Sequence, residues 1–238
     1  MLYGCENNDL LFGLGNKGEA KDKGIDDRWY EYLLNRISDS TNWEDFDPSW
    51  LSIVTFNYDQ SLEYFLSVAL QSIYGKTANE VQEKLKSLTI AHVYGRLGRD
   101  ANTLDSYGKL FDDQYDISQE IATAVTNIHL IEEGRSDDDR LNPIREIISK
   151  SERIGFLGFE FDKTNIERIS TDGIFKSIKH KQIAGTAFGF TTAEITRTMI
   201  WLGSTIADQP LAFTPTYKIE LLDKTCLPLL RETLILDR

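Results

Sequence analysis

The fold of this chain is decided by residues 52–75, SIVTFNYDQSLEYFLSVALQSIYG, which join a strand pattern to a helix pattern. Residues 52–56 form a short β-branched and aromatic run between turn-forming residues, which is typical of a buried strand. After the polar exit at 57–59, apolar residues recur every three or four positions up to Gly75, as on one face of a helix. These apolar residues are Leu62, Phe65, Leu66, Ala69, Leu70 and Ile73.

The same alternation of strand and helix patterns continues along the chain. Further strands are expected at 89–95, 153–158 and 182–188, and helices at 29–37, 78–88, 137–151, 162–169 and 191–202. Thr77 followed by Glu80 has the spacing of a capping box, while Asp162 and either Thr191 or Thr192 are suited to cap later helices. Because parallel neighbours need long crossover connections, this alternation predicts an α/β fold with a mainly parallel sheet and helices on both faces.

The domain organisation expected from the sequence is one main domain over residues 1–209, followed by a carboxy-terminal extension at 210–238. The main domain begins with a loosely ordered stretch at 1–24, which mixes Gly, Asn, Lys and Asp with brief apolar patches. A helix is expected at 117–127 and a short strand at 128–131. The extension indicates a strand followed by a helix broken near Pro228, suited to packing or oligomerisation.

Composition excludes several classes of function. The chain has 238 residues and a formal net charge of −12, and such an acidic surface repels a phosphate backbone, so nucleic acids are not expected as partners. No apolar run reaches the roughly 20 residues that span a bilayer, and we expect a soluble protein with no membrane partner. Cys5 and Cys226 have no second ligand at metal-binding spacing, so no metal site is expected. With no leader pattern, a cytoplasmic location and free thiols are the default.

Polar residues gather where the predicted strands end. The three exits are 57–59 after the first strand, 92–98 around the second, and 158–159 after the third. Ligands of parallel sheets bind beyond the carboxyl ends of the strands. The exits therefore bring an amide, a carboxylate, an imidazole and a bare backbone to one edge, a set suited to hold a sugar and a polar ring.

The segments around these exits resemble those of sirtuin-like proteins. SIVTFNYDQSLE at 52–63 resembles the family's strand-and-exit segment, IAHVYGRLG at 90–98 its histidine-glycine segment, and IGFLGFEFD at 154–162 with Asn165 its ribose-contacting exit. The resemblance covers about residues 29–202 in the family's order. Within the family, the chain resembles the bacterial NAD-consuming sirtuin-like proteins of antiphage defence, which also lack a zinc module. It implies a Rossmann-like, sirtuin-like NAD-binding fold.

The resemblance also implies roles for individual residues. Asn57 matches the asparagine that positions the nicotinamide ribose and the attacking water, and Asp59 the aspartate that faces the nicotinamide amide. His92 is the candidate general base, while Gly158 lets the backbone approach the ribose, which Asn165 also contacts. The other residues expected to contact NAD lie at the same exits and are Thr55, Phe56, Tyr58, Tyr94, Gly95 and Phe159.

Two features depart from the family pattern. The family's catalytic histidine stands immediately before a glycine, whereas here Tyr94 holds that position and His92 lies two residues earlier, on the same face of the strand. The Gly-rich phosphate-binding loop that opens the family's fold is not found, and the GxGxxG pattern at 13–18 lacks the strand and helix that such a loop needs. The predicted fold is therefore incomplete at the amino terminus.

Structural alternatives stay open beside these roles. His92 is also compatible with a hydrogen-bonded core histidine, and Asp59 with a cap of the helix that follows it. We expect an NAD hydrolase that releases nicotinamide and ADP-ribose, used in defence against phage. The alternative is a non-catalytic nucleotide-sensing or assembly module, and protein deacylation is less expected without the zinc lobe. A homo-oligomer or a defence partner protein is the expected assembly.

Overall fold

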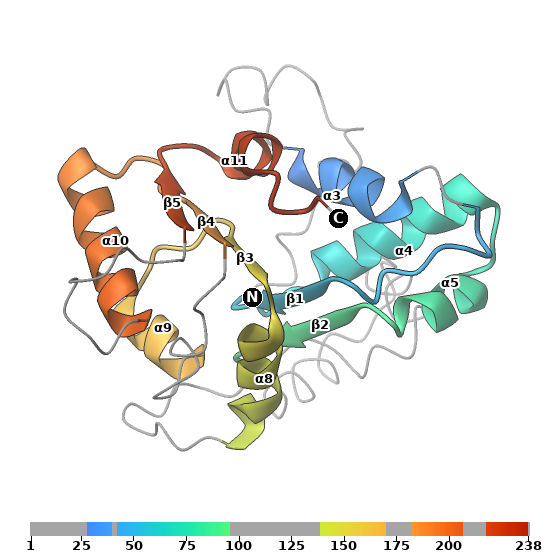
Figure 1. The fold of residues 1–238 in the computed structure, drawn as a ribbon. Coiled ribbons are helices and arrows are strands. Elements are labelled where there is room, and N and C mark those ends of the chain that lie inside the picture. Colours follow the sequence, from blue (N-terminus) through green and yellow to red (C-terminus); the bar gives the residue numbers. More distant parts are fainter. Residues whose placement is uncertain (1–27, 40–41, 96–138, 170–181, 207–217, 238) are drawn as a thin grey trace, which may run out of the picture. The chain divides into compact units, whose positions relative to one another are not determined.

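A computed structural model describes residues 28–39, 42–95, 139–169, 182–206 and 218–237 (Figure 1). The chain divides into two compact units, one of residues 1–26 and 30–133 and the other of residues 27–29 and 134–238. Each unit is described by itself. The strands and helices expected at 117–131, the loosely ordered start at 1–24 and the GxGxxG pattern lie outside the described residues.

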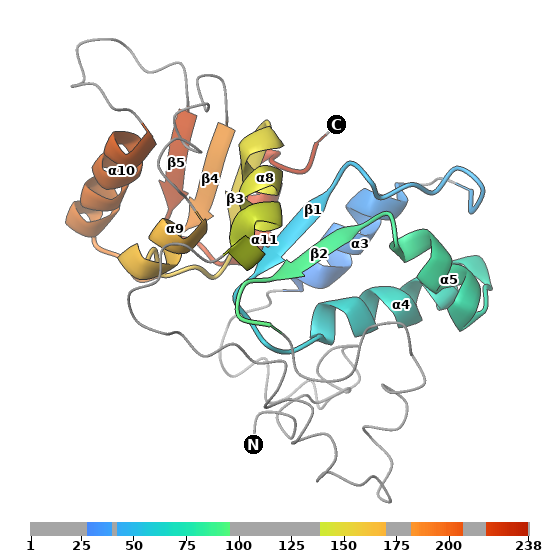
Figure 2. The same cartoon turned by 90° about the horizontal axis from the view of Figure 1, so that it is seen from below.

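The first unit contains two parallel strands and three described helices. In chain order these are α3 (Trp29–Ser38), β1 (Ser52–Thr55), α4 (Ser61–Tyr74), α5 (Ala78–Leu85) and β2 (Thr89–His92). Strands β1 and β2 run side by side (Figures 1 and 2), with Ser52 opposite Thr89 and Thr55 opposite His92. The carboxyl ends of both strands therefore lie at the same edge.

In its described residues, the second unit has parallel strands β3 (Arg153–Phe156), β4 (Gln182–Thr186) and β5 (Lys218–Leu222), paired in that order. Its elements are the 3₁₀ turn η2 (Asp139–Leu141), α8 (Asn142–Lys150), β3 (Arg153–Phe156), α9 (Lys163–Ile169), β4 (Gln182–Thr186), α10 (Thr192–Ile206), β5 (Lys218–Leu222) and α11 (Cys226–Thr233). Figure 2 shows the three strands side by side, with α10 next to β5 and α8 next to β3. Together the units confirm an α/β fold with short parallel sheets.

The local signals at helix ends are confirmed. The Thr77 hydroxyl accepts the backbone N–H of Glu80, whose carboxylate in turn accepts the N–H of Thr77 at 2.9 Å. Thr191 and Glu194 make the same pair of bonds at the start of α10. Asp162 caps α9, and Gly75 ends α4 in the left-handed conformation with φ +62°. These ends are fixed by nearby residues, which is why the sequence predicts them well.

The strands expected at 89–95, 153–158 and 182–188 end earlier in the structure, at His92, Phe156 and Thr186, and two further predictions differ from it. Ile73, expected on the buried stripe of α4, is 53% exposed, because it lies at the last turn of that helix. Pro228 does not break α11, since it lies in the first helical turn, where its missing N–H has no intrahelical partner to lose. The boundary expected at residue 209 stays a prediction, and within the described residues β5 pairs with β4 and α11 contacts β4.

The second unit is closely packed around the middle of β4. Gly185 lies between the side chains of Phe161 and Leu221, and a Cβ at this position would approach Phe161 Cζ to 2.7 Å and Leu221 Cδ2 to 2.8 Å. Both neighbours are buried, and Phe161 is held by Phe156 and Phe159 with ring centroids 5.3 and 5.4 Å away. The neighbours therefore have little freedom to move.

We predict that Gly185→Ala destabilises the protein by about 1–3 kcal/mol, because the added methyl group overpacks this site. Gly155→Ala is the matched control on β3, since its Cβ would lie 3.5 Å from Ile235, an ordinary contact distance. Urea unfolding of the two variants tests this. Equal midpoints for both would contradict the packing described here.

The capping box of α5 gives a pH-dependent contribution to stability. The backbone N–H of Thr77, and then its hydroxyl, lower the pKa of Glu80 below its ordinary 4.5. A carboxyl group whose pKa is lowered by folding stabilises the protein above the unfolded pKa, and this contribution is lost as pH falls through the folded pKa. Glu194 has a lowered pKa for the same reason, because it accepts the N–H and hydroxyl of Thr191.

We therefore predict that Glu80→Gln is less stable than the parent protein at neutral pH, and that the difference shrinks below pH 4.5. The measurement is the urea concentration at the unfolding midpoint, at neutral pH and again below pH 4.5. Glu83→Gln on the same helix is the control for charge, because Glu83 pairs with Lys86 and not with the start of α5. A difference for Glu80→Gln that is equal at both pH values would argue against the prediction.

Candidate functional site

The site in the first unit centres on Asn57, just beyond the end of β1. Its backbone N–H donates to the Thr55 hydroxyl at 3.1 Å, and its carbonyl oxygen lies 2.8 Å from Nδ1 of His92. Asn57 is exposed, and within the described part of the chain no hydrogen bond to its carboxamide is recorded. The backbone of Asn57 is thus fixed on both sides while its amide side chain faces solvent.

His92 occupies the end of β2, opposite Thr55 in the register of the two strands. Its side chain is only 5% exposed, and the backbone bond from Val93 N–H to the Thr55 carbonyl continues the pairing beyond it. Nε2 of the ring lies 2.8 Å from Oε1 of Glu63, which is in the first turn of α4 and 20% exposed. Both ring nitrogens are therefore hydrogen-bonded.

The partners of His92 define where its hydrogens lie. The Asn57 carbonyl only accepts, so Nδ1 carries a hydrogen, and an ionised Glu63 also only accepts, so Nε2 carries one as well. The pair is then imidazolium and carboxylate, or neutral imidazole with the proton on Glu63. Neither form leaves a lone pair of the ring free. The base role predicted for His92 stays a prediction, and it requires one of these hydrogen bonds to open.

Asp59 is bound to the start of the next helix. Its Oδ1 accepts the backbone N–H of Ser61 at 3.2 Å, and it also accepts the Ser61 hydroxyl. That hydroxyl lies 3.2 Å from the phenol oxygen of Tyr30 on α3. This geometry fits the structural alternative for Asp59, which fixes the first turn of α4 and leaves Oδ2 for other partners.

Aromatic rings lie beside the Asn57 exit. The ring of Tyr94 is buried, with the Phe56 centroid 5.8 Å away in an edge contact and the Tyr58 centroid 6.1 Å away. Gly95 follows with φ +78°, and its N–H donates to the carbonyl of His92. These residues, all predicted to contact NAD, are thus brought together in the first unit with Thr55, Asn57 and Asp59.

The remaining predicted residues belong to the second unit. Gly158 has φ +59°, its N–H donates to the Thr186 hydroxyl at 2.8 Å, and a Cβ there would meet nothing within 4 Å. Phe159 packs 5.4 Å from Phe156 in the aromatic cluster described above. Asn165 lies in the first turn of α9, where its N–H binds the capping Asp162. These three residues belong to the second unit, and each unit is described by itself, so they are not placed relative to the residues of the first unit.

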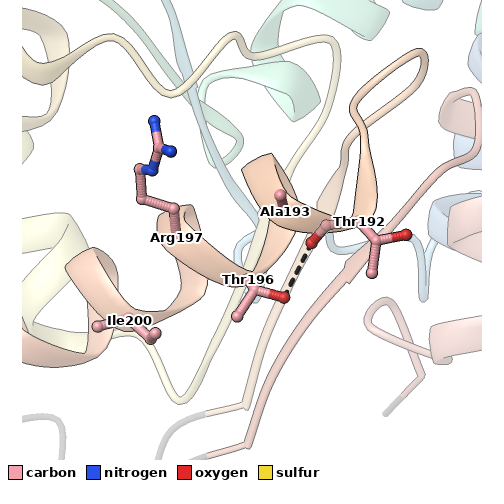
Figure 3. A pocket seen from close by; sticks show the side chains of 5 residues that line it. All are labelled: Thr192, Ala193, Thr196, Arg197 and Ile200. Carbon is pink, nitrogen blue, oxygen red and sulfur yellow. Dashed lines mark hydrogen bonds between the residues drawn. The ribbon is translucent and has the colours of Figure 1, made fainter.

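A separate hollow lies along the exposed face of α10 (Figure 3). Its volume is about 630 Å³, and its described lining residues are Thr192, Ala193, Thr196, Arg197 and Ile200. The Thr196 hydroxyl donates to the Thr192 carbonyl at 2.8 Å, so this group is used within the helix. None of the NAD-contacting or catalytic residues predicted from the sequence lines this hollow.

Glu63 is the residue that sequence reasoning missed. It lies in the 52–63 segment that carries the resemblance, but as a charged residue in the first turn of a helix it is typical of an ordinary solvated position. The signal needed is spatial, because Glu63 and His92 are separated by 29 residues and meet only where the first turn of α4 lies next to the end of β2.

Comparisons with known proteins add no relative: no protein-family model, no curated protein and no solved structure matches this chain. Among the described residues, no group of three or more His, Cys, Asp and Glu side chains is placed to hold a metal ion. In that same part of the chain, no helix has both the length and the apolar character needed to cross a membrane.

The Glu63–His92 contact is predicted to stabilise the first unit. Glu63→Ala leaves Nε2 of a nearly buried imidazole without its carboxylate, and we expect a loss of about 1–3 kcal/mol in the free energy of unfolding. Glu83→Ala, an exposed change on α5, is the control and is expected to stay within about 0.5 kcal/mol. Urea unfolding of both variants measures the difference, and equal losses would show that the contact carries little stability.

Proposed function

We propose that this chain binds NAD at the Asn57 exit and hydrolyses the bond between nicotinamide and ribose. The nicotinamide leaves with the electron pair of the glycosidic bond, water adds to the ribose carbon, and the water's second proton passes to solvent. The products are nicotinamide and ADP-ribose. The proposal begins from the resemblance to sirtuin-like proteins, and antiphage defence through NAD depletion is the biological use that this resemblance suggests.

The observation that carries the proposal is the state of Asn57. Its carboxamide is exposed while its backbone is fixed, so the amide oxygen and N–H₂ group are available to orient a ribose hydroxyl or a water molecule. Cleavage of a glycosidic bond passes through a positively charged, oxocarbenium-like state, which a preorganised oxygen dipole stabilises. The neighbouring rings of Phe56, Tyr58 and Tyr94 offer an apolar wall for a planar nicotinamide.

A second candidate is a module that binds a nucleotide without cleaving it. The observation that favours it is the engagement of the two groups best suited to acid–base work: both nitrogens of His92 are hydrogen-bonded, and one carboxylate oxygen of Asp59 is bound to Ser61. On this alternative Asn57 keeps its ribose contact, and nicotinamide is not released.

The test is nicotinamide release from NAD by the purified chain, followed by chromatography. We expect Asn57→Ala to lower the rate by about 100-fold or more, because a preorganised dipole at the reacting centre is lost. Asn42→Ala, an exposed asparagine of the same unit, is the matched control and should keep the parent rate.

The outcomes separate the candidates. Release that Asn57→Ala abolishes supports the hydrolase. NAD binding by calorimetry with no release supports the non-catalytic module. Equal rates for Asn57→Ala and Asn42→Ala would remove Asn57 from the mechanism, and the absence of both binding and release would reject both candidates.

A further inference from the structure

The contact between His92 and Asn57 joins a nearly buried ring to the residue whose side chain is exposed at the candidate site. Asn57 lies beyond the last residue of β1, so its carbonyl is outside the strand ladder and does not pair with β2 as a strand residue would. His92 Nδ1 provides that partner at 2.8 Å. The ring thus fixes the position of the Asn57 backbone, from which the exposed carboxamide extends.

Glu63 in turn determines where the ring lies. Its carboxylate holds Nε2 at 2.8 Å from the opposite side of the imidazole, and α4 fixes the carboxylate. The start of α4 is itself fixed by Asp59 and Ser61. The chain of contacts therefore runs from α4 through the side chain at the end of β2 to the backbone just beyond β1.

We propose that Glu63 and His92 are positioning residues that act together to aim the Asn57 carboxamide at the ligand. His92 acts through the N–H at Nδ1, which donates to the Asn57 carbonyl in either protonation form of the Glu63–His92 pair, and the ordering of the Asn57 backbone is complete before a ligand binds. The inference rests on the proposed function for the identity of the ligand. The positioning itself rests on the contacts among these three residues and can be tested without any activity.

Two conservative variants of His92 separate positioning from general-base catalysis. His92→Asn places an amide N–H₂ near Nδ1 and can keep the bond to the Asn57 carbonyl, whereas His92→Gln places it near Nε2 and can keep only the bond to Glu63. Neither amide is a base at neutral pH. If His92 acts as a base, both variants lose activity equally. If it positions Asn57, His92→Asn retains more activity.

We expect His92→Asn to release nicotinamide within about 10-fold of the parent rate, and His92→Gln to fall to the level of Asn57→Ala. The reduction should lie in kcat more than in KM, because positioning acts on the transition state. Equal losses for the two variants would overturn the proposal, as would a parent-like rate for His92→Gln.

Nuclear magnetic resonance gives a readout that does not need turnover. In the parent protein we expect a ring N–H signal from Nδ1 of His92, because this N–H donates to the Asn57 carbonyl in either protonation form, and the signal should broaden in Glu63→Ala, where the ring loses the carboxylate that holds it. The side-chain amide signals of Asn57 should move in His92→Gln and keep their parent positions in His92→Asn.

A protein that releases no nicotinamide but shows these spectra would reject the proposed function and keep the positioning inference. The absence of an Nδ1–H signal in the parent protein, or unmoved Asn57 amide signals in His92→Gln, would overturn the positioning inference whatever the activity. Circular dichroism of each variant confirms that the comparison is made between folded proteins.

Discussion

A nearly buried imidazole held between a backbone carbonyl and a carboxylate is the constraint on which the candidate site depends. His92 has a side chain that is 5% exposed, so each of its nitrogens needs a partner, and the Asn57 carbonyl and Glu63 supply them. The three residues come from β2, the exit of β1 and the first turn of α4. Their contacts fix the exit of β1 at the place where a ligand of a parallel sheet is expected.

At the exit of β1, the more buried groups hold the chain in place and an exposed group is left to contact a ligand. The imidazole, the Glu63 carboxylate and Oδ1 of Asp59 are engaged in holding the chain, whereas the Asn57 carboxamide is left to interact with a ligand. This arrangement favours a reaction in which the protein orients the substrate and stabilises the transition state more than it transfers protons. Departure of neutral nicotinamide from NAD is a reaction of that kind, because the leaving group needs no proton.

Much of the fold is predictable from the sequence because its signals are local. The boundaries of α5 and α10 follow from Thr77 with Glu80 and from Thr191 with Glu194, each pair separated by three residues. The place of β5 was not predictable in the same way. Its pairing with β4 joins segments more than thirty residues apart in sequence, and the pattern at 218–235 indicates a strand without indicating its neighbour.

For the candidate site, too, the features set by local sequence were predictable and the contacts between distant segments were not. The exit at 57–59 and the position of His92 near it follow from the rule that parallel strands end at one edge, and the structure brings both to that edge. The partner of His92 did not follow from the pattern. Glu63 reaches Nε2 only because the first turn of α4 lies next to the end of β2, and no spacing in the sequence encodes that placement.

The most direct test of the central claim is an NAD titration observed through side-chain amide signals in nuclear magnetic resonance. We expect the carboxamide signals of Asn57 to shift saturably as NAD is added, while those of Asn42 stay in place. Saturable binding of NAD that leaves the Asn57 amide unmoved would contradict the central claim.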